Sequence, residues 1–106
     1  MPTTIDTAIN WIPAEFGGRR TLPAIGLRSL IRFQRKIRES LTIASDVQLM
    51  SLEVDPTTWR GTATLEFFDD DTPTLKNAKE GELFELLEAY NVIAVGKILA
   101  VAKQLP

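Results

Sequence analysis

The sequence predicts an all-β domain, either a sandwich or a barrel. Turn residues recur at short intervals along the 106-residue chain, and β-branched and aromatic residues fill the segments between them. The turn signals are Pro13 with Gly17-Gly18, Pro23 with Gly26, Asp55-Pro56 with Gly61, Asp69–Pro73, and Gly81. Short strands separated by such turns are typical of antiparallel architectures. No repeat or low-complexity linker divides the sequence, so we expect a single domain over residues 1–106.

Two segments alternate in the way that strands with one buried face do. In residues 4–12 the apolar face carries Ile5, Ile9 and Trp11. In residues 62–68 it carries Ala63, Leu65 and Phe67. A period of two in apolar residues predicts a strand that packs on a core.

Residues 47–54 predict a strand that contains a β-bulge. Val47 and Leu49 share one register of the alternation, whereas Leu52 and Val54 share the opposite one. An extra residue in one strand of an antiparallel pair changes the parity in this way.

Two further segments fit a helix as well as a strand. In residues 27–41 the positions near helical spacing are Leu27, Leu30, Ile31, Ile37 and Leu41. Counted with a period of two, one face of the same segment holds Leu27, Ile31, Phe33 and Ile37. Residues 82–104 contain good helix formers, notably between Glu82 and Ala89. Periodicity alone leaves both segments open, with a slight preference for helix.

The composition excludes most catalytic chemistries. The chain has no Cys and no His, which removes thiolate zinc sites, cysteine nucleophiles, the Ser-His-Asp triad and an imidazole base. A Ser-x-x-Lys motif and a phosphate-binding P-loop are also missing from the sequence. Three consecutive carboxylates, Asp69–Asp71, diverge rather than converge on a cation, so they predict a charged loop. We therefore expect no enzyme activity and no metal, cofactor or nucleotide site.

Nothing in the sequence predicts a membrane segment or an export signal. No apolar stretch approaches the roughly 20 residues that a membrane-spanning helix needs. The N-terminal residues Met1–Asp6 lack the basic and apolar regions of a signal peptide. Because the chain also has no Cys, we expect a cytoplasmic protein without membrane contact.

The net charge of −2 conceals an uneven distribution along the chain. Residues 1–40 carry seven basic and three acidic side chains, a net charge of +4. Residues 41–106 carry five basic and eleven acidic side chains, a net charge of −6. The basic segment suits an anionic partner, and the acidic segment opposes non-specific binding to nucleic acid.

The segment from residue 15 to residue 33 contains, in order, Gly17-Gly18-Arg19, Pro23, Gly26 and Arg28. In this order it resembles the C-terminal β-barrel domain (domain 3) of translation elongation factor Tu. That domain has a Gly-Gly-Arg turn, a proline and a Gly-Tyr-Arg-Pro element; Leu27 and Ser29 stand here in place of the Tyr and the second Pro. The resemblance covers residues 5–33 well.

Residues 81–101 resemble the final hairpin of the same domain more loosely, through Gly81–Phe84 and the Ala94-Val95-Gly96 step. The family's second Glu-Gly-Gly-Arg turn is replaced here by residues 88–91. The resemblance implies that residues 27–37 and 82–101 are strands, and that the fold is a small closed antiparallel barrel of about six strands.

These observations together predict a non-enzymatic binding module. Arg19 and Arg20 of the Gly-Gly-Arg turn, with Arg28 and Arg32 of the following segment, form the expected basic face, and Lys36 or Arg38 would extend it. The resemblance implies a translation-related partner, either tRNA or a protein. The alternative is an immunity or antitoxin protein that uses the barrel to recognise another protein. Loop aromatics such as Phe16, Trp59 and Tyr90 would then contribute to the contact.

Overall fold

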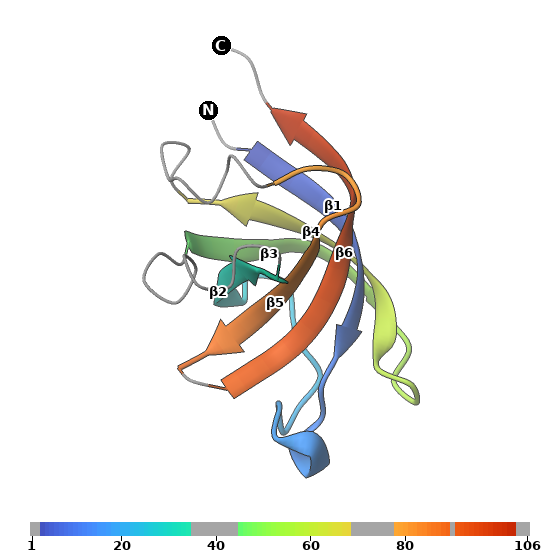
Figure 1. Ribbon diagram of the computed structural model, residues 1–106. Coiled ribbons are helices and arrows are strands. Elements are labelled where there is room, and N and C mark those ends of the chain that lie inside the picture. Colours follow the sequence, from blue (N-terminus) through green and yellow to red (C-terminus); the bar gives the residue numbers. More distant parts are fainter. Residues whose placement is uncertain (1–2, 35–44, 69–77, 90, 104–106) are drawn as a thin grey trace.

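The computed structural model describes residues 3–34, 45–68, 78–89 and 91–103. Its strands are β1 (Thr3–Trp11), β2 (Arg28–Phe33), β3 (Ser45–Val54), β4 (Arg60–Phe67), β5 (Leu83–Glu88) and β6 (Asn91–Lys103), with a short 3-10 helix, η1 (Ala14–Phe16), after β1. The strands close into an antiparallel barrel in the order β1-β4-β3-β2-β5-β6 (Figure 1). The predicted all-β class and the closed six-stranded barrel are therefore confirmed.

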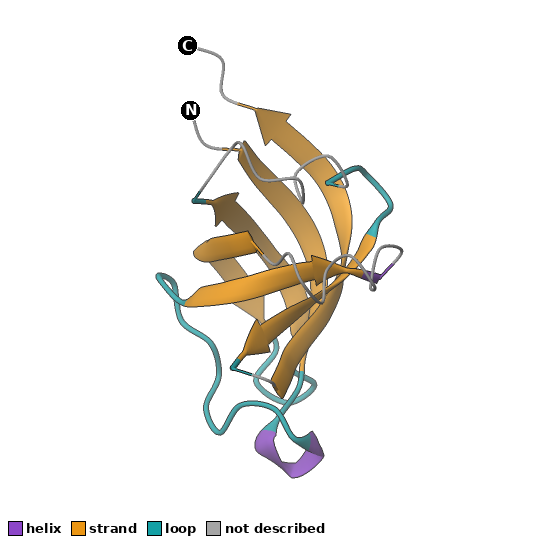
Figure 2. Ribbon diagram, turned by 60° about the vertical axis from the view of Figure 1, so that its left-hand side comes forward, coloured by secondary structure: helices purple, strands orange, loops and turns teal. Residues whose placement is uncertain are grey.

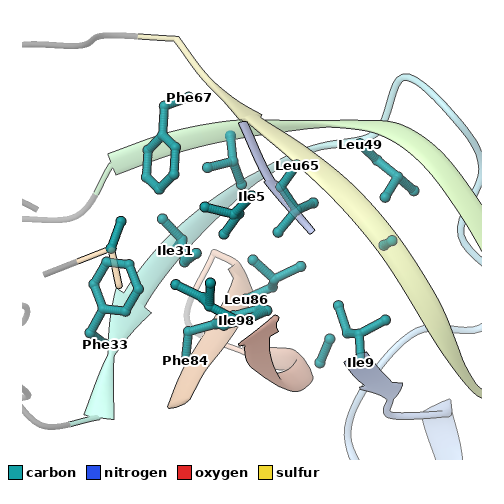
Figure 3. Close-up of a cluster of buried hydrophobic side chains, with 14 of the residues drawn as sticks. Ile5, Ile9, Ile31, Phe33, Leu49, Leu65, Phe67, Phe84, Leu86 and Ile98 are labelled. Atoms are coloured by element: carbon teal, nitrogen blue, oxygen red, sulfur yellow. The ribbon is translucent and has the colours of Figure 1, made fainter. Parts of the chain in front are cut away.

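The hydrophobic core fills the inside of the barrel, and every described strand contributes to it (Figure 3). Along β1 each buried residue alternates with a more exposed one. The predicted inward faces of β1 and β4 are confirmed, because the side chains of Ile5, Ile9 and Trp11 and of Ala63, Leu65 and Phe67 are all buried. Each fully buried Leu, Ile or Phe side chain contributes about 1.5–3 kcal/mol to stability.

The predicted β-bulge lies in β3. Leu49 pairs with Leu65 of β4, and Ser51 pairs with Thr64, so Met50 is the extra residue between two successive pairs. The side chain of Met50 is exposed. Beyond the bulge the partly buried positions of β3 are the ones that the change of parity predicts.

The slight preference for helix in residues 27–41 and 82–104 is wrong where these segments are described. The first contains β2, and the second contains β5 and β6. Strand pairing overrides helix propensity here because Ile31 faces Leu86 across the β2–β5 pair, and both side chains are buried in the barrel. The family resemblance implies strands in both segments, and the structure confirms strands there at β2, β5 and β6. Lys36 and Arg38 lie outside the described residues.

The ends of the strands and the described turns can be assigned to the two ends of the barrel (Figure 1). The start of β1 and the end of β6 lie together at one end (Figure 1). The other end carries η1, the β3–β4 turn and the β5–β6 turn, and Figure 2 shows η1 standing beyond the strand ends there. The loop that contains the Gly-Gly-Arg sequence therefore lies beside these two hairpin turns.

Candidate partner-binding surfaces

The two consecutive glycines after η1 turn the chain back against the end of β1. Gly17 has a φ of 91° in the left-handed region, which glycine adopts without strain. At Gly18 a side-chain Cβ would collide with the carbonyl oxygen of Ile12. The next residue, Arg19, donates its backbone N–H to that same oxygen at 2.8 Å. The Gly-Gly-Arg sequence thus places Arg19 beside β1 through backbone geometry alone.

The side chain of Arg19 ties this loop to the end of β5. Its guanidinium forms an ion pair with Glu88, and its Nε donates to the carbonyl oxygen of Thr21 at 3.2 Å. Only 17% of the Arg19 side chain is exposed, compared with 43% of the Glu88 side chain. Arg20 is exposed, and its side chain makes no hydrogen bond or ion pair with any described residue.

On the outer face of β2, Arg28 and Arg32 have different surroundings. Arg32 lies opposite Glu85 of β5, and their side chains form an ion pair at 3.4 Å. Arg28 is exposed, and its guanidinium carbon lies 4.2 Å from the centroid of the Phe68 ring. A cation–π contact at an exposed site contributes about 0.5–1 kcal/mol.

The predicted basic face is therefore a surface of mixed charge. Two of its four arginines, Arg19 and Arg32, are paired with glutamates, and both glutamates belong to β5. Asp46, which lies across the β2–β3 pair from Leu30, adds a further exposed carboxylate. The remaining predicted site residue, Tyr90, lies outside the described residues.

A pocket of about 500 Å³ opens at the end of the barrel between η1 and the β3–β4 turn. We call it the end pocket. Its lining includes the aromatic residues Trp11, Phe16 and Trp59, the charged residues Glu15 and Arg60, and the hydroxyl-bearing residues Thr57 and Thr58. The Phe16 side chain is 75% exposed, and the backbone N–H of Trp11 donates to the carbonyl oxygen of Trp59 at 2.8 Å. The sequence marks Phe16 and Trp59 as loop aromatics, but it gives no sign that Trp11 joins them.

The β3–β4 turn holds Trp59 in an unusual backbone conformation. Asp55 organises this turn, because its Oδ1 accepts from the N–H of Thr57 at 2.7 Å and its carbonyl oxygen accepts from the N–H of Trp59 at 2.8 Å. The backbone N–H of Asp55 donates in turn to the carbonyl oxygen of Arg60 at 2.9 Å. Trp59 has a φ of 60°, in the left-handed region where glycine is the usual residue.

The part of the chain that the structure describes contains no group of three or more Asp and Glu side chains that could hold a metal ion. Asp69–Asp71 lie outside it. Within the same ranges no helix is both long and apolar enough to cross a membrane.

Comparison with known proteins gives no match, neither to a protein-family model nor to a curated protein. The structure defines the class of the protein as a small closed antiparallel β-barrel. The resemblance to domain 3 of elongation factor Tu stays a prediction that rests on the residues quoted above.

Proposed function

We propose that the chain is a non-enzymatic binding module that recognises a surface of mixed charge on a partner protein through the outer face of β2. The observation that carries this proposal is the contact between Arg28 and Phe68. The Arg28 side chain is exposed, it lies over an aromatic ring, and no described carboxylate pairs with it. Arginine and aromatic side chains are enriched among the residues that dominate protein interfaces.

The mixed charge around Arg28 favours a protein partner over tRNA. A nucleic-acid backbone gains affinity when free cations replace its counterions. On this surface Glu85 and Glu88 already neutralise Arg32 and Arg19, and both carboxylates would repel phosphates. A protein surface can instead match alternating charges with its own acidic and basic groups.

The resemblance to elongation factor Tu makes a protein of the translation machinery the first partner to test. The alternative of an immunity or antitoxin protein uses the same kind of contact with a different partner. The absence of Cys and His from the sequence supports a role in binding rather than catalysis.

Site-specific photo-crosslinking tests the proposal. Leu30 lies between Arg28 and Arg32 on the outer face of β2, so a photoreactive residue at position 30 samples this surface. In an extract of the native cells we expect one discrete protein adduct, which Arg28→Glu abolishes. Lys79→Glu makes the same charge change at an exposed site outside β2, and it should leave the adduct unchanged.

Fluorescence anisotropy of labelled tRNA, titrated with the protein, tests the alternative that this surface binds RNA. We expect only weak binding at about 50 mM salt and none at about 200 mM, with no effect of Arg28→Ala. Micromolar binding at the lower salt concentration that is lost in Arg28→Ala would overturn the protein assignment in favour of RNA.

A further inference from the structure

A separate pocket lies on the outside of the barrel, across β1, β4 and β3, and has a volume of about 340 Å³. We call it the side groove. Its lining includes the acidic residues Asp6 and Glu53, the hydroxyl-bearing residues Thr62 and Thr64, and the apolar residues Ile25 and Leu99. The described residues that line it include no Lys and no Arg. The side groove therefore combines negative charge with apolar surface.

The two apolar side chains lie at opposite ends of the side groove. A β-bulge makes Leu99 of β6 the extra residue between two successive pairs with β1, and its side chain is exposed. At the other end, beyond β3, Ile25 belongs to the loop before β2 and is 68% exposed. The N–H of Gly26 ties this loop to β3 by donating to the carbonyl oxygen of Leu49 at 2.8 Å. Because bulges redirect side chains and often lie next to binding sites, we regard the apolar ends as part of the groove.

The two carboxylates of the side groove have no basic partner in the described part of the chain. Asp6 Oδ1 accepts a hydrogen bond from the Thr64 hydroxyl at 2.7 Å. Asp6 and Glu53 are both exposed, and neither forms an ion pair with a described residue. On β5, in contrast, Glu85 and Glu88 are each paired with an arginine. The negative charge of the side groove is therefore available to a ligand.

This charge determines the chemistry of the ligand. Both carboxylates repel a phosphate-bearing ligand. A neutral apolar ligand would remove water from the carboxylates without supplying an opposite charge, which is unfavourable. A Lys or Arg side chain avoids both problems, because its charged head pairs with a carboxylate while its aliphatic stem packs on apolar surface. Charge complementarity thus favours a basic ligand.

The strand register sets the distance between the two negative charges. Asp6 pairs with Thr64 of β4, Thr64 pairs with Ser51 of β3, and Glu53 lies two residues further along β3. Neighbouring strands are about 4.8 Å apart and each residue adds about 3.3 Å, so the two acidic Cα atoms are about 12 Å apart. In an extended peptide, two side chains four residues apart lie on one face and are about 13 Å apart.

We propose that the side groove binds an extended basic segment of a partner protein. Two Lys or Arg side chains of this segment, four residues apart, pair with Asp6 and Glu53. Their stems and the flanking residues of the segment contact Ile25 and Leu99. Arg28 is not among the residues that line the side groove, so this proposal does not depend on the contact proposed for the outer face of β2.

Titration of the intact protein with synthetic peptides tests the proposal. The probe is acetyl-Ala-Lys-Ala-Ser-Ala-Lys-Ala-amide, in which the lysines are four residues apart. One control, acetyl-Ala-Ala-Lys-Lys-Ser-Ala-Ala-amide, has the same composition with adjacent lysines, and a second control has Gln in place of both lysines of the probe. We expect the probe to cause saturable shifts of the backbone N–H signals of Asp6, Thr64 and Glu53 in the NMR spectrum. The adjacent-lysine peptide should bind at least threefold more weakly and the Gln peptide at least tenfold more weakly.

Two double variants separate the groove carboxylates from the net charge of the protein. Asp6→Asn with Glu53→Gln should weaken binding of the probe at least tenfold and leave the circular dichroism spectrum unchanged, since both positions are exposed. The asparagine also keeps an oxygen that can accept from the Thr64 hydroxyl. Glu15→Gln with Glu80→Gln makes the same charge change at exposed positions outside the side groove. It should weaken binding less than twofold.

The apolar ends of the side groove have a matched pair of variants as well. Leu99→Ser should weaken binding of the probe about threefold, because it removes an exposed apolar side chain from the lining. Leu83→Ser makes the same change at a similarly exposed position of β5 outside the groove, and it should have no effect. Arg28→Ala should also leave binding of the probe unchanged.

The proposal is overturned if the probe causes no saturable shift at millimolar concentration, or if the adjacent-lysine peptide binds equally well. It is also overturned if the variant with Asp6→Asn and Glu53→Gln binds the probe as the unchanged protein does. Analytical ultracentrifugation tests a different occupant, a second copy of the chain. Dimers of the unchanged protein that become monomers in this double variant would assign the side groove to self-association instead.

Discussion

Arg19, in the loop after η1, forms an ion pair with Glu88 at the end of β5, although 69 positions separate the two residues in the sequence. The pair connects the Gly-Gly-Arg loop to the β5–β6 turn at one end of the barrel. At the same end of the barrel, the backbone N–H of Arg19 donates a hydrogen bond to the carbonyl oxygen of Ile12. Arg19 therefore holds the loop on the barrel, and we expect its substitution to change stability as well as any contact with a partner.

A double-mutant cycle on this pair measures its contribution. Arg19→Ala and Glu88→Ala should each lower the free energy of unfolding, and the coupling energy between them should be about 0.5–1 kcal/mol because Glu88 is partly exposed. Urea unfolding monitored by fluorescence gives all four free energies. The coupling should decrease at high salt, since solvent screens such a pair. Strictly additive losses would show that the ion pair does not hold the loop.

Gly96 in β6 lies directly against Phe84 of the neighbouring strand. A Cβ at position 96 would lie 2.5 Å from Phe84 Cζ and 2.9 Å from the carbonyl oxygen of Ala8. Gly96→Ala should therefore lower the free energy of unfolding by about 1–3 kcal/mol through overpacking. Adding Phe84→Leu to the Gly96→Ala variant should recover part of this loss, because it removes the ring that the new Cβ meets. The coupling energy between the two substitutions, measured by urea unfolding, tests this expectation. If the two losses simply add, steric conflict with Phe84 is not the cause.

The parts of the fold that the sequence predicts are those that local patterns determine. Alternation over a few residues sets the inward face of a strand, as in β1 and β4, because successive side chains point to opposite sides of the sheet. The bulge at Met50 is also predictable, since the parity changes between Leu49 and Leu52. Alternation does not reveal which strands pair, so the choice of a closed barrel over a sandwich depends on the family resemblance.

The candidate site is harder to predict than the strands, because its properties depend on residues that are far apart in the sequence. The basic face follows from the arginine positions, but its partial neutralisation depends on Glu85 and Glu88, which become neighbours only when β5 pairs with β2 and meets the loop after η1. The end pocket likewise needs Trp11, at the end of β1, to meet Trp59 of the β3–β4 turn. For the same reason the helix formers between Glu82 and Ala89 give the wrong prediction. These residues form β5, because they pair with β2 and β6 in the folded chain.

The left-handed conformation of Trp59 predicts an unusual order of stability for two substitutions. Trp59→Gly and Trp59→Ala lose the same packing against the core, but only alanine keeps a Cβ at a φ of 60°. The glycine variant should therefore be more stable than the alanine variant by about 1 kcal/mol, which is the reverse of the usual order of these two residues. Thermal unfolding of the two variants measures the difference. Equal stability would indicate that the β3–β4 turn relaxes to another conformation.

The pair of Arg32 and Glu85 should respond asymmetrically to substitution. Both side chains are largely buried, at 19% and 13% exposed, and Arg32 Nε has no hydrogen-bond partner among the described residues. Glu85→Ala leaves the arginine without its counter-ion, so it should lower the free energy of unfolding by about 1–3 kcal/mol. Replacing both residues by apolar side chains, Arg32→Met with Glu85→Leu, should return stability to within about 1 kcal/mol of the unchanged protein.

Urea unfolding of the two single variants and the double variant tests this order. A double variant that is less stable than Glu85→Ala would contradict it, because the pair would then stabilise the barrel beyond the loss of its charges. The same double variant also bears on the proposed function. If Arg28 carries the partner contact, the photo-crosslink from position 30 should persist in the double variant, since Arg28 and Phe68 are unchanged. Its loss in a well-folded double variant would instead assign the contact to Arg32.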